Sequence, residues 1–181
     1  MVILNVTRVD KMFTDELLDS LAKDDFLDRK KYHNILSSIN ITDDDSNTML
    51  SYAVNYGNYS MSTFLLREGA NPNCIDSLGN TPLIEASLFG YYDIVKILLE
   101  NQSHINHQNN LGETAISAAA SNGHIEIVKL LMNYNADWTI EDYMGTTPIA
   151  WAKVEGHNEI VKILSEASVT GDNDNPPSSK A

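Results

Sequence analysis

Residues 79–100 read GNTPLIEASLFGYYDIVKILLE, two short helical patterns separated by one glycine. Thr81 can cap the first pattern because its hydroxyl can accept a hydrogen bond from a free N–H of the first turn. Pro82 follows at the first helical position, where proline is best tolerated. Gly90 can adopt the left-handed conformation that ends a helix. The stretch therefore predicts a first helix near residues 82–89 and a second, amphipathic helix that begins near Asp93.

The same pattern recurs four times at a constant interval of 33 residues. Threonine marks the cap, alanine allows close approach between helices, glycine ends the first helix and leucine lies in the second. A period of this length indicates a solenoid in which each unit packs against its neighbours. The four invariant columns are Thr48, Thr81, Thr114 and Thr147; Ala53, Ala86, Ala119 and Ala152; Gly57, Gly90, Gly123 and Gly156; and Leu65, Leu98, Leu131 and Leu164.

The turn sequences carry a family resemblance. Gly-Asn-Thr-Pro-Leu stands at residues 79–83 and Gly-Thr-Thr-Pro-Ile at residues 145–149. With two short helices and a projecting turn in every unit, the chain resembles the ankyrin repeat family. The resemblance implies an all-α solenoid of stacked helix pairs, with β-turn fingers set roughly at right angles to the helices. We expect four repeats, at residues 43–75, 76–108, 109–141 and 142–167.

The two ends of the chain depart from the repeat. Residues 1–42 do not fit it, but Thr14 can cap a helix and residues 26–39 have helical apolar spacing. We expect a degenerate N-terminal helical cap there, because a terminal unit must present one polar flank to water. The last helix is expected to end near Ser165 and Glu166. Residues 168–181 are expected to form a disordered tail, since Asn, Asp, Pro and Ser dominate its end.

Some positions depart from the family pattern. The histidine that usually follows Thr-Pro-Leu is replaced, which implies the loss of a hydrogen bond that braces the turn, so we expect less rigid turns. The first repeat is the least regular, with Ser46 in place of the turn glycine and Met49 in place of proline. The residues that replace the histidine are Ser51, Ile84, Ser117 and Ala150.

The composition favours a folded, acidic protein. The hydrophobic share is 43%, and 25 acidic side chains against 12 basic ones give a formal charge of −13. This charge repels nucleic acid and anionic membrane surfaces, which favours a basic protein as partner. It could also serve only to keep the protein soluble and monomeric. We therefore expect a monomer when free, with no nucleic-acid or membrane partner.

The sequence gives no sign of secretion or membrane insertion. Cys74 is the only cysteine, so an intramolecular disulfide is excluded and a reducing compartment fits best. Residues 1–6 lack the basic region of a signal peptide, and no run approaches the roughly 20 apolar residues of a membrane span. We expect a cytoplasmic location.

Candidate catalytic and metal sites are weak. His104 and His107 could offer two metal ligands, but zinc needs three or four protein ligands and no further ligand has matching spacing. Cys74 lacks a nearby base, and the Asp43 to Asp45 run lacks the spacing of a calcium loop. His124 and His157 directly follow repeat glycines, where a packing role is expected. We therefore predict no metal, no cofactor and no enzymatic activity.

The resemblance implies a concave surface formed by the fingers and the first helices. Aromatic and apolar side chains ringed by acids suit a protein interface. For Leu78 and Leu111 the alternative is that they pack between neighbouring fingers. The residues expected to bind the partner are Asp44, Asp45, Tyr52, Tyr56, Leu78, Glu85, Leu88, Phe89, Leu111, Glu113, Tyr143, Met144, Trp151 and Glu155.

Several functions remain open at this point. The first is a non-catalytic module that grips a protein, as a stoichiometric inhibitor of a basic enzyme such as an immunity protein for a nuclease toxin. An adaptor, a scaffold or a secreted effector-type ankyrin protein that recruits a partner is the alternative. An unrecognised enzyme would need clustered titratable residues in a pocket. A nucleic-acid mimic would need a long track of carboxylates, whereas the acids cluster near the N-terminus and the first turn.

Overall fold

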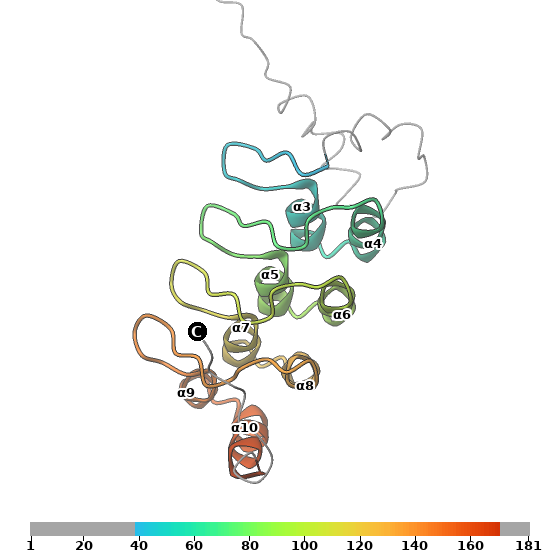
Figure 1. The fold of residues 1–181 in the computed structure, drawn as a ribbon. Coiled ribbons are helices and arrows are strands. Elements are labelled where there is room, and N and C mark those ends of the chain that lie inside the picture. The colour runs from blue at the N-terminus through green and yellow to red at the C-terminus, as the bar shows by residue number, and fades with distance from the viewer. Residues whose placement is uncertain (1–38, 171–181) are drawn as a thin grey trace, which may run out of the picture.

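The computed structural model describes residues 39–170, which form a stack of helix pairs (Figure 1). These residues contain eight helices and no strand, which confirms the expected all-α solenoid. The first helices form an inner row, the second helices form an outer row, and four fingers project on the side of the inner row away from the outer row. The inner helices are α3 (Met49–Asn55), α5 (Pro82–Phe89), α7 (Ala115–Ser121) and α9 (Pro148–Val154), and the outer ones are α4 (Tyr59–Arg67), α6 (Tyr92–Glu100), α8 (Ile125–Asn133) and α10 (Asn158–Thr170).

Each inner helix begins and ends where its threonine and glycine predict. Thr81 accepts a hydrogen bond from the backbone N–H of Ile84, and Thr48, Thr114 and Thr147 make the equivalent bond in their repeats. The four repeat glycines have φ between 65° and 80°, a conformation that costs other residues energy. The caps and stops are local interactions, so the sequence alone was enough to find them.

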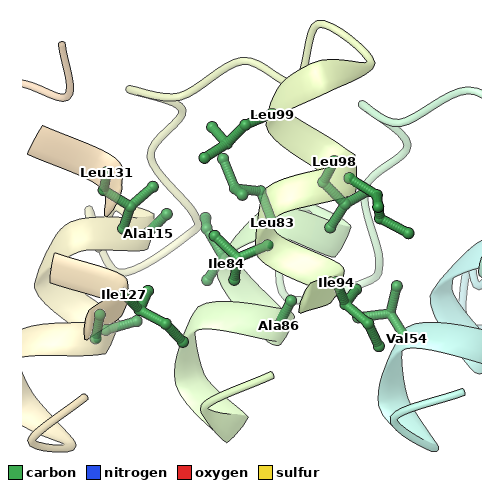
Figure 2. Packing of buried hydrophobic residues seen from close by; sticks show 14 of the residues in the cluster. Val54, Leu83, Ile84, Ala86, Ile94, Leu98, Leu99, Ala115, Ile127 and Leu131 are labelled. Atoms are coloured by element: carbon green, nitrogen blue, oxygen red, sulfur yellow. The ribbon is translucent and has the colours of Figure 1, made fainter. Parts of the chain in front are cut away.

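The core runs along the stack between successive repeats. The alanine column of the inner helices is completely buried, and the leucine column of the outer helices is at most 1% exposed. Figure 2 shows apolar side chains of α5 and α6 packed together and against those of the neighbouring repeats. A repeat therefore buries its apolar faces both between its own two helices and against its neighbours.

Histidines lock neighbouring repeats together. The His124 ring lies over Gly90, where an added Cβ would come within 2.6 Å of the ring, and its Nε2 is 3.0 Å from the carbonyl oxygen of Leu88. His157 repeats this contact on Gly123, with Nε2 3.1 Å from the carbonyl oxygen of Ser121. The predicted packing role of both histidines is confirmed.

Each finger has two hydrogen bonds across its turn that do not involve the family's histidine. Asp76 begins the second finger, and its Oδ1 accepts from the backbone N–H groups of Leu78 and Asn80 at 2.9 and 2.7 Å. The same pair of bonds forms in the other fingers, and Ser46 adopts the left-handed φ of 66° that glycine has elsewhere. The residues that accept these bonds in the other three fingers are Asp43, Asn109 and Asp142.

The last helix is longer than predicted. Helix α10 continues to Thr170, past the expected end at Ser165 and Glu166 and past the expected start of the tail at residue 168. The hydroxyls of Ser165 and Ser168 donate to carbonyl oxygens one turn earlier, at 2.7 and 2.9 Å, so these serines do not interrupt the helix. The rest of the predicted tail, residues 171–181, lies outside the described residues, as does the predicted cap up to residue 38. In the part that the structure describes, no helix is long and apolar enough to span a bilayer.

Candidate protein-binding surface

The tips of three successive fingers carry exposed apolar side chains. Leu78, Leu111 and Met144 are 63%, 65% and 75% exposed. The backbones of Leu78 and Leu111 pair with the next finger, but their side chains are exposed and not packed between fingers, which argues against the alternative reading of these two residues. The adjacent Tyr143 is 72% exposed, so the fourth finger presents two large side chains. The first finger differs, because it exposes Asp44 and Asp45 at the equivalent positions.

A second group of exposed side chains lies where the inner helices end. Tyr56, Leu88 and Phe89 are between 40% and 49% exposed, and Glu155 is exposed in the fourth repeat. The Phe89 ring lies 5.7 Å from that of Tyr91, measured between centroids. The prediction that these four residues are accessible is confirmed.

Sequence reasoning missed Val154, which is 73% exposed at the end of α9. The signal was present, because Val154 occupies the repeat position of Leu88, two units further along. A search along the columns for every apolar residue would have found it.

Three residues expected to be exposed on the concave surface are instead buried or half-buried. Glu85 is only 7% exposed, so the expectation that it is accessible was wrong. Tyr52 and Trp151 are half-buried, at the same repeat position as Glu85. The hydroxyl of Tyr52 donates to Asp43 Oδ2 at 2.6 Å, and Trp151 Nε1 donates to Asp142 Oδ2 at 2.8 Å. In the first and last repeats, this position therefore ties the inner helix to the base of its own finger.

The second repeat has a carboxyl group at this position in place of a donor. Burial raises the pKa of Glu85 to about 7, and the negative charge of Asp76 adds to the increase, while a hydrogen bond with Asn55 opposes it. Glu85 therefore changes its charge near neutral pH, which an exposed glutamate does not do.

Burial and hydrogen bonding together set the pKa values of Tyr52 and Asp142 in the other two pairs. Burial and the bond to Asp43 raise the pKa of Tyr52 to about 12, so its hydroxyl remains a donor at neutral pH. Burial acts to raise the pKa of Asp142, but bonds from the Thr146 backbone and the Trp151 indole outweigh it, so the pKa is lowered overall. Glu113 is also partly buried, and its Oε2 accepts a hydrogen bond from Asn109 Nδ2 at 2.9 Å.

Comparison with known families identifies the fold. A family model described as ankyrin repeats matches in the segments 16–109 and 101–174. The chain belongs to the ankyrin repeat family. Ankyrin repeats are protein–protein interaction modules, and the family is generally non-catalytic. A search of curated proteins found no match to this chain.

Charge is divided between the two sides of this ankyrin stack. Within residues 39–170, four of the five lysine and arginine side chains lie on the outer helices, and only Lys153 lies on an inner helix. The outer helices also carry acids, some of them paired with lysine, as in Lys129 with Glu126 at 2.8 Å. The acids of the fingers and inner helices are Asp43, Asp44, Asp45, Asp76, Glu85, Glu113, Glu141, Asp142 and Glu155.

Replacing Trp151 by phenylalanine tests the tie between helix and finger. The change keeps an aromatic ring but removes the donor to Asp142, so we expect the free energy of unfolding to fall by about 1–2 kcal/mol. The pKa of Asp142 should rise towards its ordinary value, since one of the bonds that lower it is lost. Chemical denaturation and NMR titration of the Asp142 carboxyl measure the two effects. An unchanged Asp142 pKa would contradict the hydrogen bond.

Proposed function

We propose that this ankyrin protein is a non-catalytic module that grips a basic protein with the acidic and aromatic surface of its fingers and inner helices. The division of charge within residues 39–170 carries the proposal: the fingers and inner helices hold nine acids, of which only Glu85 and Asp142 are buried, and one lysine, whereas the other four basic side chains of these residues lie on the outer helices. Such a field speeds the encounter with a basic partner, and exposed aromatic and apolar side chains supply contact energy. The free protein is proposed to be a monomer.

The role favoured for this module is stoichiometric inhibition of a basic enzyme, as an immunity protein inhibits a toxin. Inhibition requires only that the surface cover the target, and fast electrostatic capture suits that task. A free Cys74 fits a reducing compartment, which supports a cytoplasmic site of action. An adaptor, scaffold or effector that recruits a partner would use the same surface but would leave the partner active.

The dependence of association on salt tests the charge argument. The full chain is used to capture partners from its native source, and candidates identified by mass spectrometry are produced for kinetic measurements. We expect the association rate to fall markedly as ionic strength rises from low to physiological, while dissociation changes less. An association rate that does not depend on salt would contradict a role for charge in binding.

A matched pair of variants locates the effect on the molecule. Asp44→Asn with Asp45→Asn removes two exposed charges from the finger side, and Asp93→Asn with Glu100→Gln removes two exposed charges from outer helix α6. We expect the first pair to slow association more than the second. Equal effects would mean that only net charge matters. An assay of the partner's own activity at a 1:1 ratio then separates an inhibitor from an adaptor.

A further inference from the structure

The four fingertips form a row held in fixed register. The backbone N–H of Ser77 donates to the carbonyl oxygen of Asp45, that of Asn110 to Leu78, and that of Tyr143 to Leu111, each at 3.0 Å. Within each finger, the aspartate or asparagine at its base holds the turn with two further bonds. The tip side chains therefore occupy defined places relative to one another, and a bound partner meets a preformed surface.

The chemistry of the row changes in one direction. Its first member exposes two carboxylates, the next two expose one leucine each beside a polar residue, and the last exposes Tyr143 and Met144. Figure 1 shows the fingers in this order along the stack. Packed helices lie about 8–10 Å apart, so the apolar tips span roughly 20 Å and the acidic tip lies roughly 10 Å beyond them.

We propose that the fingertip row binds a protein segment in a single direction. Lysine or arginine side chains at one end of the segment contact the first finger, and apolar side chains contact the other three. This inference rests on the proposed function and adds the partner's chemistry and orientation to it. A reversed segment would place its cations on apolar tips and leave Asp44 and Asp45 facing apolar groups, so the gradient disfavours that orientation.

Other occupants of the apolar tips fit less well. A membrane surface would bring anionic headgroups towards the acids of the finger side. A second copy of the chain would bring another acidic surface against this one if like surfaces met. A segment with a basic end is the occupant that satisfies both parts of the row.

Selection from a random peptide library tests the proposal. The full 181-residue chain is panned against displayed linear peptides of about 20 residues, because a helix of that length spans about 30 Å, which matches the row. We expect the selected peptides to carry lysine or arginine at one end and apolar residues over the rest. Selected peptides without this separation, or no selected peptides at all, would overturn the proposal.

Variants of the tips show where the selected peptides bind. We expect Asp44→Lys with Asp45→Lys, and separately Leu111→Asp, to weaken their binding at least tenfold, whereas Lys96→Asp on the outer row leaves it unchanged. When the selection is repeated on the Asp44→Lys, Asp45→Lys variant, the selected peptides should carry acidic residues at the end that carried lysine or arginine before. Circular dichroism and thermal unfolding confirm that each variant is folded. Tip substitutions without effect would reject the fingertip site.

The failure of this inference can be told apart from failure of the proposed function. Phe89→Asp could abolish the binding of peptides or captured partners while the tip substitutions leave it unchanged. That result would support the binding module and reject the directional row. Self-association of the free chain that Leu111→Asp abolishes would assign the tips to a second copy and would also reject the proposal. Failure to bind any protein or peptide would overturn both.

Discussion

Replacing Ala119 by leucine is expected to lower the free energy of unfolding by about 1–3 kcal/mol, or more if the stack cannot adjust. Ala119 is completely buried on α7, the inner helix between α5 and α9. The larger side chain must push apart helices that alanine allows to approach closely. Urea denaturation followed by circular dichroism measures the change.

Lys96→Leu is the matched control, because it adds an apolar side chain at an exposed helical position. We expect it to change the free energy of unfolding by less than about 0.5 kcal/mol. If Ala119→Leu were equally mild, the inner helices would not be in the close contact that the alanine column implies. Loss of the two-state transition in the Ala119 variant would also be informative, because repeat arrays can unfold in parts.

Glu85→Gln is expected to stabilise the protein above neutral pH. The pKa of Glu85 is raised from 4.5 to about 7 in the folded protein, so the folded state holds its proton more tightly than the unfolded state does. The stabilisation from that proton is fully present below pH 4.5 and is lost as pH rises through 7. Glutamine keeps the shape and an acceptor for Asn55 but never ionises. At pH 8 the variant should therefore be more stable than the wild type by about 2–3 kcal/mol.

The difference in free energy of unfolding between Glu85→Gln and the wild type should shrink as pH falls from 8 to 5. Comparing them at each pH cancels the contributions of the other titrating groups. Glu155→Gln on the exposed end of the same surface is the control, because it removes a carboxyl that is not buried, and it should not reproduce the gain in stability at pH 8. A Glu85 variant whose stability follows the wild type in parallel would show that the carboxyl is not buried.

Most of the architecture could be read from the sequence because its signals are local. A threonine cap bonds to a backbone N–H three residues later, and a glycine stop acts through its own φ angle. Both leave a residue signature at one position, and the 33-residue period repeats it four times. The resemblance to ankyrin repeats placed Leu78, Leu111 and Met144 at the tips of fingers, but it left open whether Leu78 and Leu111 pack between neighbouring fingers.

The end of the last helix was harder to predict, because serine hydroxyls in α10 bond back to the preceding turn. Residues 168–170 were therefore assigned to the tail although they are helical. Gly171 directly follows Thr170 and is a possible stop residue, but it was grouped with the tail. The period could not help either, because no further repeat follows there to supply a matching column.

Only the tertiary structure decided how each finger lies against its own inner helix. That packing places residues nine apart in contact, so Tyr52 reaches Asp43 and Trp151 reaches Asp142, while Glu85 is buried near Asp76 and its pKa rises. No local propensity encodes such a contact, because it depends on the angle between a turn and a helix. The sequence thus determined the repeat, whereas the fold determined that the finger tips are exposed and which side chains at the base of the fingers are accessible or buried.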